Sequence, residues 1–109
     1  MEGLELICFQ IISASGGAKS AYMAALEAAK EGNYEDAENM IKEGDEMLNQ
    51  GHAPHATLVQ QEAAGHSPEV SLILIHAEDQ MMGAETFKAM VEQLIDVYKE
   101  LDALKAKVA

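Results

Sequence analysis

The sequence predicts an all-α protein, an antiparallel bundle of three helices. Apolar residues recur at three- and four-residue steps over most of the chain, and short stretches rich in glycine, asparagine, serine and proline interrupt that spacing in two places. Tryptophan is absent and aromatic residues are few, so the core is expected to be aliphatic and rich in methionine. The expected organisation is a single domain, residues 1–109, with helices at about 4–31, 34–63 and 68–107.

The first predicted helix contains a glycine pair, Gly16-Gly17. Each glycine in a helix costs about 1 kcal/mol relative to alanine, so either the helix breaks there or close packing against a neighbour compensates. The alanine-rich stretch 18–29 favours a continuous helix. Gly32 is then expected to end this helix and Asn33 to cap the next one, and the short turn makes the two helices antiparallel neighbours.

The second predicted helix contains Pro54. Proline removes one backbone hydrogen bond from a helix and tends to kink it. The segment around Pro54 is therefore either a bend in one long helix or a break between two short ones, and we favour the bend. Residues 64–67 are expected to connect this helix to the third.

The third predicted helix begins at Pro68, because Ser67 is a suitable N-cap and proline is favoured at the first helical position. The near-unbroken apolar run 70–75 fits either a buried strand or a helix packed on two sides. The helical spacing of apolar residues from Met81 to Leu104 decides for a helix, which places His76 about two turns from its start. Two neighbouring helices cannot cover all sides of the run 70–75, so the chain is expected to self-associate.

The chain is strongly acidic, with 19 acids against 7 bases and a formal net charge of -12. This charge repels nucleic acid and anionic membrane surfaces, so a protein partner is expected rather than either of these. The single Cys8 cannot form an internal disulfide, and no secretory leader or bilayer-spanning stretch is recognised. A cytoplasmic protein without direct membrane insertion is the resulting expectation.

The residues alone leave the role of the histidines open. His76 ends an apolar run, where a histidine is more often a packing residue with a hydrogen-bond partner than a nucleophile. Asp79, on the same helix face, is one acid among many. His52 and His55 have a His-x-x-His spacing, with His66 nearby, so a metal-storage or metal-sensing bundle is one alternative.

One segment carries a family resemblance. It resembles the active-site signature of the lactose/cellobiose-specific enzyme IIA components of the bacterial phosphoenolpyruvate-dependent sugar phosphotransferase system, and it reads Val70-Ser-Leu-Ile-Leu-Ile-His-Ala-Glu-Asp-Gln-Met-Met82. Further segments resemble the same family in the same order: residues 11–29, Gly32-Asn33-Tyr34, Leu48-Asn49 followed by His52, and residues 92–101. The resemblance covers most of the chain.

The resemblance implies a phosphoryl relay. His76 would accept a phosphoryl group from the phosphocarrier protein HPr and pass it to enzyme IIB, which serves the membrane component IIC. The family also forms homotrimers in which Asp79 would hold one divalent cation shared by the three subunits, and Mg²⁺ suits such oxygen ligands. Gln80 lies four residues after His76, so it is a candidate to stabilise the phosphoryl oxygens.

Two matters stay open at this point. The alternative to the relay is a non-enzymatic helical oligomerisation or regulatory module in which His76 is structural. The sugar is also undetermined, because the signature does not distinguish lactose, cellobiose, chitobiose or another sugar.

Overall fold

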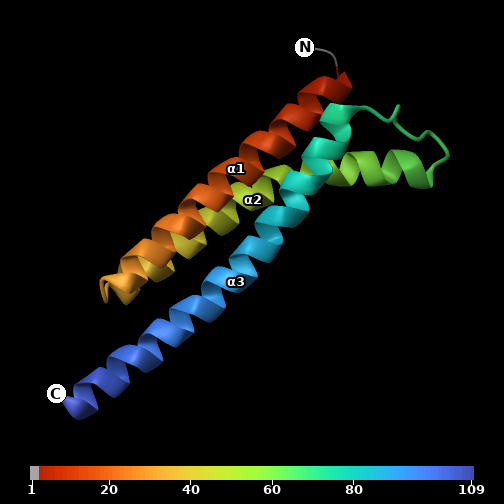
Figure 1. Ribbon diagram of the computed structural model, residues 1–109. Coiled ribbons are helices and arrows are strands. Elements are labelled where there is room, and N and C mark those ends of the chain that lie inside the picture. The colour runs from red at the N-terminus through yellow and green to blue at the C-terminus, as the bar shows by residue number, and fades with distance from the viewer. Residues whose placement is uncertain (1–2) are drawn as a thin grey trace.

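A computed structural model describes residues 3–109, and it confirms the all-α class. The helices are α1 (Gly3–Lys30), α2 (Tyr34–Ala63) and α3 (Leu72–Val108). Helix α2 runs back along α1, and α3 then runs in the same direction as α1, which gives an elongated molecule of 62 × 21 × 20 Å (Figure 1). Helix α1 contacts both other helices along much of its length, whereas α2 and α3 contact each other at few points.

Helix α1 is continuous through Gly16-Gly17, as the alanine-rich stretch predicted. At Gly17, close packing against α2 compensates for the low helix propensity of glycine, since a Cβ atom there would lie 3.1 Å from Sδ of Met47. Small side chains also allow α1 to approach its neighbours closely, and its buried alanines are Ala14, Ala18, Ala21, Ala25 and Ala29. Helix α1 is therefore the central element against which the other two pack.

The turn between α1 and α2 has the expected glycine but not the expected cap. Gly32 has a φ of 83°, and the N–H groups of Gly32 and Asn33 donate to the carbonyls of Ala29 and Ala28, which is a Schellman motif. Asn33 occupies the N-cap position of α2, but its side chain makes no capping hydrogen bond. The prediction of a side-chain cap was therefore wrong. Asn33 contributes only its backbone carbonyl, which accepts a hydrogen bond from Ala37 N–H at 3.0 Å.

Helix α2 is one long helix with Pro54 inside it, so the prediction of a bend rather than a break is confirmed. Figure 1 shows the second half of α2 turning away from α1 and extending beyond the bundle. The helix ends in a second Schellman motif, where Gly65 has a φ of 85° and the N–H groups of Gly65 and His66 donate to Glu62 and Gln61. The bend moves the start of the next connection away from the bundle.

Helix α3 begins at Leu72, so the predicted start at Pro68 was wrong. Ser71, not Ser67, is the N-cap, and its hydroxyl accepts a hydrogen bond from Leu74 N–H at 3.3 Å. The non-helical residues 66–71 return from the bent end of α2 to the bundle (Figure 1). Extended chain spans about 3.3 Å per residue, whereas a helix rises only about 1.5 Å per residue. If residues 68–71 were helical, the connection would be shorter and would reach less far from the bent end of α2.

A polar cluster joins all three helices midway along the bundle. The buried Tyr22 hydroxyl donates to Oδ1 of Asp45 at 2.7 Å, and Nζ of Lys88 lies 2.9 Å from the same oxygen. Burial and this hydrogen bond raise the pKa of Tyr22, and the bond to Asp45 raises the pKa of Lys88. The ring of Tyr22 fits because residue 44 is glycine: a Cβ there would lie 2.5 Å from Cε1 of Tyr22.

This close approach predicts opposite effects for two glycine substitutions. Gly44→Ala is expected to lower the free energy of unfolding by about 1 to 2 kcal/mol, because the clash with a buried ring outweighs the gain in helix propensity. Gly16→Ala is the matched control, since nothing lies within 4 Å of a Cβ there. It should raise the free energy of unfolding by about 0.5 to 1 kcal/mol. Urea titration followed by circular dichroism measures both, and equal stabilisation by both variants would contradict the prediction.

Candidate functional site

His76 lies about one turn into α3, and its side chain is exposed. Within residues 3–109, its imidazole has neither a hydrogen bond nor an ion pair. The interpretation of His76 as a buried packing residue therefore does not fit this subunit. An exposed imidazole without a partner retains a nitrogen lone pair for attack on an electrophile.

An apolar seam of exposed side chains runs along the whole of α3. Its members lie three, four, seven or eight residues apart and are between 41% and 83% exposed: Leu72, Ile75, Met82, Met90, Leu94, Val97, Leu101, Leu104 and Val108. Asp79 is exposed and lies between Ile75 and Met82 on this seam. The helical spacing thus places one carboxylate within an otherwise largely apolar stripe, adjacent to the face that carries His76.

Gln80 contacts α1, through a residue that the sequence did not single out. Nζ of Lys19 donates to Oε1 of Gln80 at 3.4 Å, and the contact is partly buried. A Cβ at Gly83 would lie 3.5 Å from the same Nζ atom, so the ammonium group lies over α3 between Gln80 and Gly83. The sequence did contain a signal for Lys19: it is the first basic residue of the chain, and its neighbours in sequence are small or apolar.

The other three histidines do not come together. His52 Nε2 lies 3.5 Å from Glu85 Oε1, and His55 Nε2 contacts Glu78 Oε1, so each pairs with its own carboxylate on α3. His66 lies in the connection after α2. Over residues 3–109, no three histidine, cysteine, aspartate or glutamate side chains are grouped as a metal site would need. The predicted alternative of a metal-storage bundle built on these histidines has no support within one subunit.

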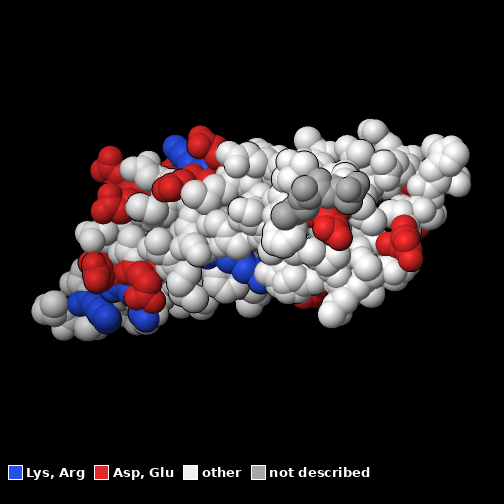
Figure 2. Space-filling view, turned by 90° about the horizontal axis from the view of Figure 1, so that it is seen from above, with Lys and Arg blue, Asp and Glu red and all other residues white. Residues whose placement is uncertain are grey.

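Charged side chains are unevenly distributed. In the view of Figure 2, acidic and basic groups gather toward the end of the molecule that carries the C-terminus, and the other half of this face is mainly uncharged. At the charged end, the Tyr34 hydroxyl donates to Asp102, and this bond raises the pKa of Tyr34 to about 12. Nζ of Lys99 lies 5.6 Å from the centre of the same ring. These contacts fasten the α1–α2 turn to α3, away from His76.

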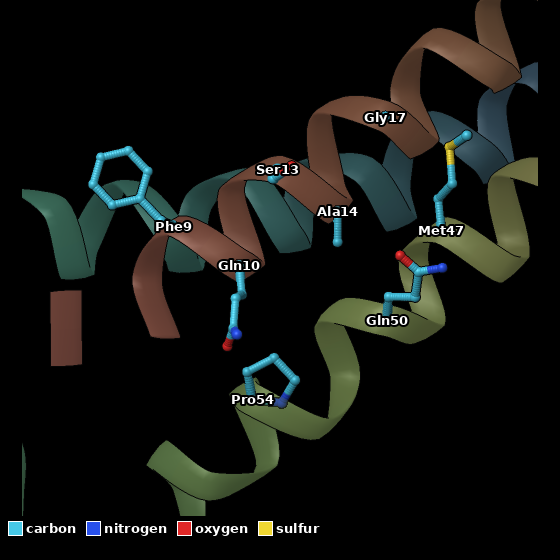
Figure 3. Close-up of a pocket in the computed structure, with 8 residues that line it drawn as sticks. All are labelled: Phe9, Gln10, Ser13, Ala14, Gly17, Met47, Gln50 and Pro54. Carbon is cyan, nitrogen blue, oxygen red and sulfur yellow. The ribbon is translucent and has the colours of Figure 1, made fainter. Parts of the chain in front are cut away.

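A groove of considerable size lies elsewhere, between α1 and α2 on either side of the bend. It has a volume of about 720 Å³, and Figure 3 shows Gln10 pointing toward Pro54 and Met47 lying below Gly17. Its lining residues are Phe9, Gln10, Ser13, Ala14, Gly17, Met47, Gln50 and Pro54. None of the predicted site residues His76, Asp79 or Gln80 is among them, so the candidate site is the exposed face of α3.

Over residues 3–109, the fold and this face define a class: a small helical protein that presents the unpartnered His76 beside an exposed, largely apolar helix stripe. The family model described as "PTS system, Lactose/Cellobiose specific IIA subunit" matches residues 6–99. The chain therefore belongs to the lactose/cellobiose-specific enzyme IIA family of the sugar phosphotransferase system, and it is a phosphotransferase component that relays phosphoryl groups.

Individual relatives agree with this assignment. The chain is 37% identical over 100 residues to the lichenan-specific phosphotransferase enzyme IIA component of Bacillus subtilis, covering 92% of this chain and 91% of that protein. It is similar to the crystal structure of the cellobiose-specific enzyme IIA from Bacillus anthracis, with a TM-score of 0.91, 41% identity and 94% of each chain covered. It is also similar to a chain in the IIA(chitobiose)-HPr complex of Escherichia coli, with a TM-score of 0.80, 30% identity, and 94% and 99% of the two chains covered. Within residues 3–109, no helix is both long and apolar enough to cross a membrane.

Proposed function

We propose that His76 is the residue that carries the phosphoryl group, accepting it from HPr and passing it to enzyme IIB in the cytoplasm. The observation that carries the proposal is the exposed, unpartnered imidazole on α3, within the matched span of the family. A relative of known structure is bound to HPr, which supports HPr as the donor for this chain.

The chemistry needs no additional base. A neutral imidazole is itself the nucleophile, because one ring nitrogen carries a free lone pair. Its nitrogen lone pair forms the new P–N bond while the P–N bond to the HPr histidine breaks, and that bonding pair returns to the leaving ring. Phosphoryl transfer of this kind depends mainly on positioning and on stabilising the charge of the phosphoryl oxygens. A hydrogen-bond donor such as the Gln80 amide would serve the second need.

The relatives are named for different sugars, among them lichenan, oligo-β-mannoside and lactose. These are β-linked saccharides, and we propose the same broad class for the uptake system that this chain serves. No sugar site is required on this chain, because the phosphoryl group reaches the sugar only after enzyme IIB, at the membrane component IIC.

The proposed working form is a homotrimer associated through the apolar seam. A largely apolar exposed stripe of this length is typical of an association surface rather than of a monomer surface. The three- and four-residue steps of the seam are those of helices that pack around a common axis. A symmetric arrangement would bury the seam of each subunit against those of two others.

In such a trimer the three Asp79 carboxylates would meet near the axis. Like charges repel strongly where water is excluded, unless protons or a cation compensate. Asp79 fits a divalent cation, because its exposed carboxylate supplies oxygen ligands. Three subunits would together supply three such carboxylates. We propose one Mg²⁺ per trimer at this point, where it would hold the subunits together.

Intact-mass spectrometry tests the role of His76. Wild-type protein incubated with phosphoenolpyruvate, enzyme I and HPr is expected to gain one acid-labile phosphoryl group, and His76→Gln is expected to gain none. His66→Gln is the matched control, since it removes a histidine from the connection and should be phosphorylated as the wild type is. An adduct on folded His76→Gln would overturn the proposal, as would a wild type that stays unmodified while the same HPr phosphorylates another enzyme IIA.

A further inference from the structure

The proposed phosphoryl carrier and two further residues form a continuous strip on α3. Gln80 follows His76 by four positions and Gly83 follows it by seven, so all three lie on one face of α3. Lys19 of α1 covers the Gln80 and Gly83 part of this strip, with Nζ 3.4 Å from Oε1 of Gln80. A Cβ at Gly83 would be in ordinary van der Waals contact with this ammonium group, which places the group directly against α3. The fold therefore brings one basic residue of α1 onto the face that carries His76.

The remaining basic residues lie elsewhere in the structure. The chain has seven lysines and arginines in total. Lys30 and Lys42 pair with acids of their own helices, Lys88 pairs with Asp45, and Lys99 lies over Tyr34. Lys105 and Lys107 lie in the last turn of α3. A phosphoryl group adds about two negative charges to a chain whose formal net charge is already -12. A cation on this face would partly offset that repulsion.

The contact also fixes the orientation of the Gln80 amide. An ammonium group can only donate, so it selects the carbonyl oxygen of the carboxamide and leaves the NH₂ end as the free end. That NH₂ group is a hydrogen-bond donor on the face of His76. A phosphoryl group offers only acceptor oxygens, so this orientation of Gln80 is the one that it requires.

We propose that Lys19 is a positioning residue for phosphoryl transfer at His76: it holds the carbonyl oxygen of Gln80 and thereby aims the Gln80 NH₂ group at the phosphoryl oxygens. The inference rests on the proposed function of His76. It concerns the transfer in which the P–N bond to the HPr histidine breaks as the P–N bond to His76 forms, with no change in the number of bound protons. Lys19 touches none of the reacting atoms and acts through Gln80.

The test is the single-turnover rate of transfer from phosphorylated HPr to the full chain, measured by rapid quench and intact mass. Lys19→Met removes the ammonium group and keeps the apolar stem, and it is expected to slow transfer about tenfold. Lys19→Arg restores a donor and should stay within about twofold of the wild type. Lys42→Met is the matched control, because it removes one exposed lysine whose partner is Glu38 of the same helix, and its rate should be unchanged.

A double-mutant cycle separates positioning from general charge. In a Gln80→Ala background, Lys19→Met is expected to cause no further slowing, because the group through which Lys19 acts is already gone. The NMR signals of the Gln80 NH₂ group should shift on phosphorylation in the wild type and not in Lys19→Met. Multiplicative rate losses in the double variant, or a wild-type rate in folded Lys19→Met, would overturn the inference. Phosphorylation of His76→Gln would instead overturn the proposed function, so the two failures are distinguishable.

Discussion

Val97→Glu is expected to dissociate the proposed homotrimer into monomers that remain helical. Val97 lies in the middle of the apolar seam and is 48% exposed in the single subunit. Association would bury the exposed half of this side chain in three copies, each worth about 0.7 to 1.5 kcal/mol, and the substitution replaces that gain with three carboxylates that repel one another near one axis. Association should weaken at least about a thousandfold, because each 1.4 kcal/mol is about tenfold. Sedimentation velocity over a range of concentrations measures the change.

The control for this experiment is Ala106→Glu. It adds the same charge to the same helix, at an exposed position that the helical spacing places off the seam. This variant should sediment as the wild type does. If Val97→Glu also sediments as the wild type does, the seam is not the association surface, and the homotrimer would have to form through another face.

Asp79→Leu is expected to make the assembly more stable and independent of divalent cations. The carboxylate interrupts the seam between Ile75 and Met82, so leucine would make the stripe continuous and remove three repelling charges. Burial of leucine contributes about 1.5 to 3 kcal/mol per subunit. If the proposed cation is bound, EDTA should lower the melting temperature of the wild type, whereas the melting temperature of Asp79→Leu should be higher and insensitive to EDTA.

Asp96→Leu is the comparison for Asp79→Leu, because Asp96 is an exposed aspartate of α3 that the helical spacing places off the seam. It should retain the EDTA sensitivity of the wild type. If EDTA lowers the melting temperature of Asp79→Leu as much as that of the wild type, the cation binds elsewhere on the protein. Neither aspartate variant should lose phosphorylation at His76, provided that the trimer forms.

The helices themselves could be predicted from local signals, whereas the start of α3 could not. Gly32 ended α1 as expected, and the continuity of α2 through Pro54 was anticipated because the helical pattern continues on both sides. The start of α3 was wrong, because Ser67-Pro68 and Ser71 are both acceptable helix starts locally. The choice depended on how far the chain must reach from the bent end of α2, which is a property of the whole fold.

The candidate site divides in the same way. His76, Asp79 and Gln80 belong to one short stretch of one helix, so their common side of α3 follows from 3.6 residues per turn. Whether His76 is exposed or buried did not follow, since the apolar run before it is compatible with either. Lys19 is 61 residues from Gln80 along the chain, and only the packing of α1 on α3 reveals their contact.

The sequence by itself determined the helical class, the family and the stretch that carries the chemistry, because each depends on residue type and local spacing. Only the tertiary structure decided where α3 begins, that His76 is exposed, that the apolar stripe of α3 is left uncovered by its own subunit, and that Lys19 reaches Gln80. These properties depend on how far one helix lies from another and on which faces they turn to each other. Side-chain packing between distant segments sets those quantities, and local propensity does not encode them.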